Sequence, residues 1–217
     1  MTKSAILKAA EEFTRQQLDG AEAGHDWWHV VRVRRTAKYI CQKEGGDRFT
    51  VELAALLHDI GDSKFHGGDE EVGPRQVEHF LDSIQLDAKI KKHVLDIVKH
   101  ISFRKSLEGQ VFSSKELSIL QDADRLDAIG AIGIARAFSF GGFKNREFFN
   151  PLVKPQKELT AKAYKQRKSP TINHFYEKLL LLKDQMNTAT GKQLAQDRHR
   201  FMEAYLEQFY REWHGKS

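Results

Sequence analysis

The chain contains the segment Val51-Glu-Leu-Ala-Ala-Leu-Leu-His-Asp-Ile-Gly61, in which two ionisable residues, His58 and Asp59, follow an apolar run. Apart from Glu52, the run is apolar on every side, which is typical of a helix buried in a protein core. Burying an ionisable pair is unfavourable unless a counter-charge or a metal ion compensates it. Because an adjacent imidazole and carboxylate can reach one divalent cation, the segment predicts a metal site in a helical core.

Two other motifs supply matching ligands. His29 ends the motif His25-Asp-Trp-Trp-His29 and lies on the apolar stripe of its predicted helix. A single histidine on such a face is more often a hydrogen-bonded core residue, but the other candidate ligands favour a metal ligand here. Asp124 supplies a second carboxylate further along the chain.

Three aspartates compete for this last ligand position, and helix geometry ranks them. Asp124 falls four residues after Leu120, on the buried stripe of its helix. Asp122 shares a face with Lys115, so we expect it to meet solvent. Asp127 is partly on the inward side and is the second choice.

Two imidazoles and two carboxylates predict one divalent metal ion, Mn²⁺, Fe²⁺, Co²⁺, Ni²⁺, Zn²⁺ or Mg²⁺, without choosing among them. On an octahedral ion, four protein ligands leave two positions for water and a substrate oxygen. Two further histidines, His93 and His100, lie seven residues apart on one predicted helix face. They leave two alternatives open, namely a second metal and a His100 side chain that faces the substrate.

The residues that follow the ligand pair are candidates for catalysis. Asp62 and Lys64 lie in a glycine-rich loop, where the carboxylate can orient water and the lysine can meet phosphate charge. A solvated loop is the alternative, and we favour the functional interpretation. Arg104 and Lys154 are weaker candidates for binding phosphate, and we expect the tryptophans before His29 to pack in the core rather than to stack on a base.

Chain length and composition predict one soluble domain over residues 1–217. Within it we expect a metal-site core at 22–142, a basic loop at 143–168 and a C-terminal helical pair at 169–214. The 40% hydrophobic and 30% charged residues are ordinary for a globular protein, and no apolar run approaches the ~20 residues of a membrane span. A single cysteine, Cys41, fits a reducing cytoplasm. Residues 154–168 hold six basic side chains against one acidic. This excess favours a small phosphorylated partner over nucleic acid, because aromatic residues do not interleave with it.

Helical periodicity predicts an all-α fold, since no strand alternation appears. The expected helices cover residues 4–18, 26–44, 50–61, 70–84, 88–100, one opened by Ser113, 131–140, one opened by Ser169, and a last one opened by Thr190. Thr50 is the expected cap of the third helix. The helix from Ser169 should bury Phe175, Leu179, Leu182 and Met186, and the last helix should use Leu194, Phe201, Tyr205 and Phe209.

Four motifs together resemble the HD-domain metal-dependent phosphohydrolases. They are His25-Asp-Trp-Trp-His29, Leu56-Leu-His-Asp-Ile-Gly-Asp-Ser-Lys64, Val98-Lys-His-Ile-Ser-Phe103 and Asp122-Ala-Asp-Arg-Leu-Asp-Ala-Ile-Gly130. The chain is similar to the small bacterial members of the YedJ/YpgQ type over nearly its whole length. The resemblance implies a single all-helical domain and one divalent metal held by His29, His58, Asp59 and Asp124.

The resemblance also implies hydrolysis of phosphate esters or anhydrides. It favours nucleoside or deoxynucleoside triphosphates, cleaved to monophosphate and pyrophosphate. A nucleotide phosphodiesterase or a 5′-nucleotidase on the same metal site is the alternative. A regulatory module that binds nucleotide without turnover is the alternative of another class, and the intact ligand set argues against it. The base preferred, the metal used in the cell and the oligomeric state stay open.

Overall fold

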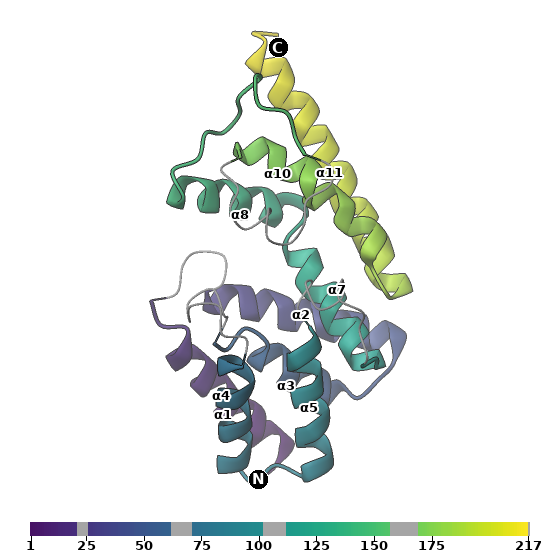
Figure 1. Cartoon of the computed structure of the whole chain (residues 1–217). Helices are drawn as coiled ribbons and strands as arrows, with labels where there is room; N and C mark the ends of the chain where they lie inside the picture. Colours follow the sequence, from purple (N-terminus) through teal and green to yellow (C-terminus); the bar gives the residue numbers. More distant parts are fainter. Residues whose placement is uncertain (21–25, 62–70, 102–111, 157–168, 217) are drawn as a thin grey trace. The chain divides into compact units, whose positions relative to one another are not determined.

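A computed structural model describes residues 1–20, 26–61, 71–101, 112–156 and 169–216 of the chain. Every regular element within these ranges is a helix, so the predicted all-α fold class is confirmed (Figure 1). The helices form two compact units, Met1–Ala123 and Asp124–Ser217. A single HD-type domain over the whole chain stays a prediction.

The first unit is built around its third helix. Its elements are α1 (Lys3–Gln17), α2 (Trp27–Glu44), α3 (Arg48–Leu57), α4 (Val72–Ser83), α5 (Ala88–His100) and the first part of α7 (Lys115–Asp127). All α3 residues after Arg48 are buried, and α3 packs against α1, α2 and α5. Figure 1 shows α3 between α1 and α5. Apart from Thr50 and Glu52, its buried side chains are apolar on every side because other helices surround it.

The buried carboxylate of Glu52 is compensated within this core. It accepts two hydrogen bonds from the Arg34 guanidinium, at 2.8 and 3.0 Å, and one from Arg48 at 2.8 Å. Burial by itself would raise the pKa of Glu52, but the hydrogen bonds from Arg48 and Arg34 hold it below its usual value. Glu52 is therefore a charged residue of the core that its arginine partners stabilise.

The ends of α3 differ from the sequence prediction. Its N-cap is Asp47 instead of Thr50, and the Asp47 carboxylate accepts hydrogen bonds from the Thr50 backbone N–H at 3.1 Å and hydroxyl at 2.5 Å. The helix ends at Leu57, so His58 and Asp59 lie in the following turn rather than inside the helix. Gly61, with a φ of +65°, completes this turn in a left-handed conformation that favours glycine.

The cap of α7 also lies one residue from the predicted position. Ser114, instead of Ser113, accepts a hydrogen bond from the backbone N–H of Leu117 at 3.1 Å. The Glu116 carboxylate, in the first turn of α7, accepts a hydrogen bond from the backbone N–H of Asp47 at 2.9 Å. This bond joins the first turn of α7 to the start of α3.

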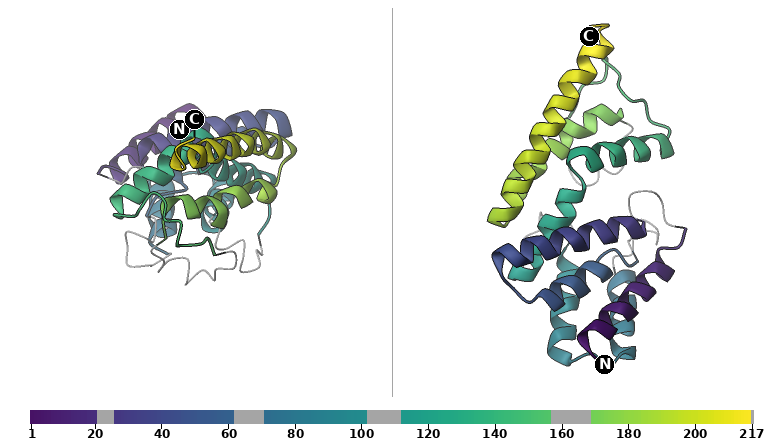
Figure 2. Two further views of the ribbon diagram at one scale, coloured as in Figure 1. Left: turned by 90° about the horizontal axis from the view of Figure 1, so that it is seen from above. Right: turned by 180° about the vertical axis from the view of Figure 1, so that it is seen from behind.

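The second unit contains the end of α7, α8 (Gly130–Phe143), α10 (Thr171–Glu177), the 3₁₀ helix η2 (Leu179–Gln185) and α11 (Ala189–Trp213). Helix α11 packs against α8 and η2, and α10 packs against the same two elements. Figure 2 shows α11 as one long rod with α8 and α10 beside it. The core of the second unit buries Phe175, Leu179, Leu182 and Met186, as predicted.

Two expectations about α8 and the following helix were wrong. Helix α8 does not end at Gly141 but continues to Phe143. Gly141 lies inside the helix and allows close packing, since a Cβ there would lie 2.2 Å from the Thr171 hydroxyl. The helix expected from Ser169 starts at Thr171 and breaks at Lys178 into α10 and η2.

The last helix is rotated from its expected register. Thr188, instead of Thr190, caps α11 by accepting from the Gly191 backbone N–H at 2.9 Å. Phe201 is 53% exposed, whereas the buried residues are Gly191, Ala195, His199, Met202 and Leu206. Of the four predicted residues, Leu194, Tyr205 and Phe209 are half-buried, and the Tyr205 ring stacks on the buried Phe175, so the prediction was wrong for Phe201.

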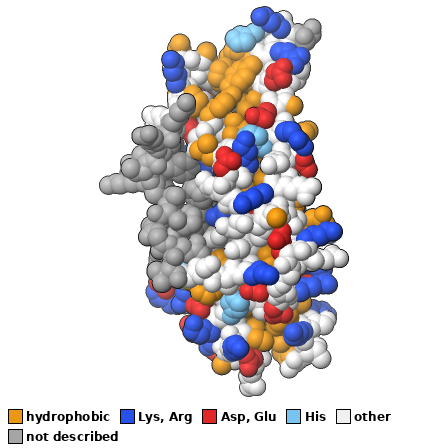
Figure 3. All heavy atoms as spheres, turned by 90° about the vertical axis from the view of Figure 1, so that its right-hand side faces the viewer, with side chains coloured by type: hydrophobic (Ala, Val, Ile, Leu, Met, Phe, Trp, Pro, Cys, Tyr) orange, Lys and Arg blue, Asp and Glu red, His pale blue; other side chains and the backbone are white. Residues whose placement is uncertain are grey.

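The second unit exposes several large apolar side chains, including Phe143, Phe148 and Trp213. In Figure 3, hydrophobic side chains gather near the C-terminal end of the face shown. No single helix of the described ranges is long and apolar enough to cross a membrane, although α7 and α8, which meet at a bend of 64°, reach that length together.

Candidate metal centre

His29 lies in the first turn of α2, on its buried side. Asp26 caps the helix, and its carboxylate accepts a hydrogen bond from the backbone N–H of His29 at 2.9 Å. The His29 side chain has no solvent exposure, and Val30 and Val33 are buried on the same helix. The cap and the apolar neighbours therefore fix a polar ring inside the core.

His58 and Asp59 are held by a tight turn between α3 and α4. The His58 side chain is buried, and the Asp59 side chain is 18% exposed. Helix α4 approaches this turn so closely that a Cβ on Gly73 would lie 2.2 Å from the carbonyl oxygen of Ile60. A side chain at Gly73 would displace the backbone next to Asp59, so glycine is required for this packing.

The donor atoms of His29, His58 and Asp59 converge on one point. The two Nε2 atoms are 3.3 Å apart. Asp59 Oδ2 lies 3.3 Å from Nε2 of His29, and Asp59 Oδ1 lies 3.6 Å from Nε2 of His58. Within the described ranges, these three side chains form the group whose donor atoms are close enough to share an ion.

These separations fit a single divalent cation. Metals such as zinc bind imidazole nitrogen and carboxylate oxygen at about 2.0–2.2 Å, so neighbouring donors around one ion lie roughly 3.0–3.5 Å apart. The separations of 3.3 to 3.6 Å lie at or close to this range, with Asp59 approaching His29 through Oδ2 and His58 through Oδ1. The mixed nitrogen and oxygen donors suit the transition metals expected from the sequence. The residues present therefore fit the predicted metal ion.

The orientation of His58 also favours a metal ligand. Its Nδ1 lies 2.9 Å from the carbonyl oxygen of Ala55. Because a carbonyl oxygen only accepts, Nδ1 donates its proton, and a neutral ring then has its lone pair on Nε2. That lone pair lies at the convergence point, and a backbone partner on the other nitrogen is the usual support of a metal-bound histidine.

The three aspartates of α7 have different surroundings. Asp124 is half-buried and is the first residue of the second unit, and its ligation of the same ion stays a prediction. Asp127 is buried, and its carboxylate accepts a hydrogen bond from Arg136 at 2.7 Å. Asp122 has no exposure, so the prediction that it meets solvent was wrong. Residues 119–123 are all buried, so this part of α7 exposes none of its sides to solvent.

Arginines fix the last turn of α7 within the second unit. Arg125 donates to the carbonyl oxygen of Gln185 at 2.5 Å, and Arg198 of α11 donates to the carbonyl oxygen of Leu126. The Arg136–Asp127 pair adds a third connection, to α8. The backbone that carries Asp124 is therefore held by η2, α8 and α11.

The two histidines of α5 are engaged in contacts within the first unit. His93 Nε2 lies 3.2 Å from the Ser114 hydroxyl and 3.6 Å from the Glu116 carboxylate. His100 Nδ1 donates to the carbonyl oxygen of Asp96 at 2.7 Å. Neither belongs to the convergent group, so a second metal gains no support from the described residues. A substrate contact by His100 stays a prediction.

The candidate catalytic residues Asp62 and Lys64 lie outside the described residues, and so does Arg104. Lys154 is exposed in the second unit. Trp28 was expected in the core but is 61% exposed. Since consecutive helical residues differ by about 100° in direction, burial of His29 already turns Trp28 away from the core.

The comparisons with known proteins agree with this geometry. The HD domain family model matches residues 27–129, a stretch that contains all four predicted ligands. Bacillus subtilis YpgQ is 40% identical over 93% of this chain and 92% of its own length. An HD-superfamily hydrolase from Bacillus thuringiensis has a TM-score of 0.79 and 40% identity, covering 99% of this chain and 100% of that one. The structure of Bacillus subtilis YpgQ in complex with ADP has a TM-score of 0.76 and 34% identity, covering 98% and 97%.

Proposed function

Since this chain belongs to the HD-domain family of hydrolases, we propose that it converts nucleoside or deoxynucleoside triphosphates into monophosphates and pyrophosphate. The observation that carries the proposal is the convergence of His29, His58 and Asp59 donor atoms within 4.8 Å of one another. A divalent cation bound there lowers the pKa of a coordinated water and polarises a phosphoryl oxygen. This chemistry is what phosphate hydrolysis requires.

His29, His58, Asp59 and, in this proposal, Asp124 hold the cation. Two neutral imidazoles and two carboxylates balance its double positive charge, so the ligand set leaves no excess charge for the substrate. A triphosphate carries about four negative charges and needs further cations. Lys64, Arg104 and Lys154 are the residues proposed to neutralise them.

A nucleotide substrate is supported by the relative that was crystallised with ADP, Bacillus subtilis YpgQ. In the proposed reaction, the oxygen of water forms a bond to the α-phosphorus. The bond between that phosphorus and the oxygen bridging to the β-phosphorus breaks, and pyrophosphate leaves with the bonding electrons. Asp62 is proposed to orient the water or to accept its proton, and Lys64 is proposed to neutralise charge on the phosphates.

Product identification tests the reaction. The protein, loaded with Mn²⁺ or Co²⁺, is incubated with dATP, dGTP, dCTP and dTTP, and the products are separated by anion exchange. Monophosphate and pyrophosphate in equal amounts are expected. Turnover of monophosphates alone would indicate a 5′-nucleotidase, and turnover of cyclic nucleotides alone a phosphodiesterase. Tight nucleotide binding without any product would indicate the regulatory module.

The fourth ligand is tested by metal analysis of two matched variants. Asp124→Asn should lose most of the bound metal, because a neutral amide is a weaker ligand. Asp127→Asn should keep it, because the Asp127 carboxylate is engaged with Arg136. The opposite pattern would assign the ligand to Asp127.

The roles of the loop residues are tested by kinetics. Lys64→Ala should keep the metal and lose most of its kcat, as expected when a charge that develops in the transition state loses its partner. Asp62→Asn should lower kcat more than it raises KM. Wild-type kinetics in both variants would indicate that Asp62 and Lys64 are solvated loop residues without a catalytic role.

A further inference from the structure

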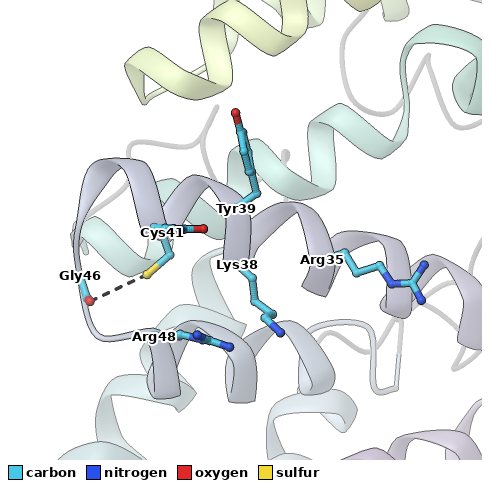
Figure 4. A pocket seen from close by; sticks show the side chains of 7 residues that line it. Arg35, Lys38, Tyr39, Cys41, Gly46 and Arg48 are labelled. Carbon is cyan, nitrogen blue, oxygen red and sulfur yellow. Dashed lines mark hydrogen bonds between the residues drawn. The ribbon is translucent and has the colours of Figure 1, made fainter.

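A hollow of about 480 Å³ lies on the outer side of α2, at the start of α3. It is lined by Arg35, Lys38, Tyr39, Cys41, Gln42, Gly46 and Arg48. Its volume falls within the range of small-molecule sites. Figure 4 shows Lys38 and Arg48 on one side of α2 and Tyr39 on the other, with Arg35 further along the helix.

The hollow is separate from the metal centre. Tyr39 follows His29 by ten residues in the same helix, a rise of about 15 Å. His29 faces the core with no exposure, whereas Tyr39 is 47% exposed. A ligand in the hollow therefore contacts a different part of α2 from a ligand at the metal.

Positive charge dominates the middle of this hollow. Of the seven residues that line it, three are basic, Arg35, Lys38 and Arg48, and none is acidic. Within the described ranges, Arg35 has no ion-pair partner, and the Lys38 amine lies 4.0 Å from the nearest oxygen of Glu52. The Nε–H of Arg48 donates a hydrogen bond to the Glu52 carboxylate, and the Arg48 side chain is 67% exposed. These three cations keep N–H donors available for a ligand.

The acidic groups nearby are already hydrogen-bonded. Glu52 is buried and is held by Arg34 and Arg48. At the Gly46 end of the hollow, Asp47 caps α3 through Thr50, and the Glu116 carboxylate accepts a hydrogen bond from the backbone N–H of Asp47. Burial raises the pKa of the Cys41 thiol, which therefore adds no negative charge at neutral pH. An anion in the hollow would be held by Arg35, Lys38 and Arg48.

We propose that this hollow binds a polyphosphate chain through Arg35, Lys38 and Arg48. Two sources share this chemistry, a nucleoside polyphosphate and inorganic polyphosphate. Tyr39 also lines the hollow, and its exposed ring could contact the base of a nucleotide but has no counterpart in inorganic polyphosphate, so this residue distinguishes the two sources. The proposal rests on α2 and α3 alone and does not depend on the reaction at the metal centre.

Titration calorimetry in EDTA tests the site without a contribution from the metal centre. Inorganic tripolyphosphate should bind wild-type protein, and Arg35→Ala and Lys38→Ala should each weaken binding about fivefold. Lys92→Ala, which removes an exposed lysine of α5, is the matched control and should bind as wild type. Binding unchanged in Arg35→Ala and Lys38→Ala, or absent from wild type, would overturn the proposal.

The source of the phosphate chain is tested with Tyr39→Ala. If the ligand is a nucleotide, ATP should bind wild type more tightly than tripolyphosphate does, and Tyr39→Ala should remove only that advantage. Equal affinities in both proteins would assign inorganic polyphosphate to the same site. In a two-dimensional amide spectrum, Gln42 and Arg48 should shift on addition of either ligand. Shifts confined to other parts of the chain would contradict the location.

Discussion

Metal loading should raise the thermal stability of this protein through His29, His58 and Asp59. With one donor atom from each residue, the three atoms lie within 4.8 Å of one another in the folded chain, so we expect an ion to bind with little rearrangement. In the unfolded chain, His29 and His58 are separated by 28 intervening residues, and no such arrangement persists. The cation therefore binds the folded state much more tightly, and binding is linked to folding.

The expected magnitude follows from this linkage. Free metal at a hundred times its Kd stabilises the folded state by about 2.7 kcal/mol. For a chain of about 200 residues, each kcal/mol shifts the Tm by roughly 2–4 °C, so the Tm should rise by about 5–10 °C. Differential scanning calorimetry, with metal-free and Mn²⁺-loaded or Zn²⁺-loaded protein, measures the shift.

The variant Asp59→Asn tests whether these residues are responsible. The substitution keeps the size of a side chain that is 18% exposed, so the fold should persist while the metal-dependent shift shrinks or disappears. His79→Ala, which removes an exposed histidine of α4, should show the full shift. An equal rise in wild type and Asp59→Asn would refute the assigned site, because the metal would then bind elsewhere.

Two further predictions concern residues that support the fold around the metal site, Glu52 and Gly73. Glu52→Gln should destabilise the fold by about 3 kcal/mol, because two arginines lose a buried charged partner. Since folding lowers the pKa of Glu52, its carboxylate stabilises the fold above the ordinary carboxyl range near pH 4.3, and this contribution is lost as pH falls through the lower folded pKa. Urea unfolding from about pH 6 to 3 should accordingly show a weaker acid dependence in Glu52→Gln; an unchanged slope would contradict this role. Gly73→Ala should lower stability by about 1–3 kcal/mol and weaken metal binding, because its Cβ would meet the carbonyl oxygen of Ile60. Gly142→Ala, whose Cβ would meet no atom within 4 Å, is the control and should be neutral or stabilising by up to about 1 kcal/mol.

The sequence predicts the parts of this molecule that depend on periodic burial. The fold class, the extents of α2 and α5, and the convergence of His29 with His58 and Asp59 follow from apolar stripes and from ionisable residues within them. These features depend on whether a side chain is buried, which local patterns indicate well.

The errors arise where tertiary packing decides. Nothing local shows that Gly141 serves contact with Thr171 rather than a helix end. Asp122 has a polar neighbourhood in sequence, yet α7 is covered on all sides at that level, so the residue is buried. In α11 the aromatic side chain of Phe201 lies outside and Met202 lies inside, which periodicity alone could not distinguish.

The difference at the end of α3 has a consequence for the chemistry of the site. Within a regular helix, adjacent side chains point about 100° apart, so His58 and Asp59 would diverge around the axis. His58 still has helical backbone angles, with φ of −65° and ψ of −31°, and the chain leaves the helix after it. Asp59 Oδ1 then lies 3.6 Å from Nε2 of His58, although the two residues are consecutive. The apolar helix α3 buries the start of this turn, while Gly61 and Gly73 let α4 close over its end. The long apolar run and the two glycines therefore act together, because they place an adjacent imidazole and carboxylate where both can bind one ion.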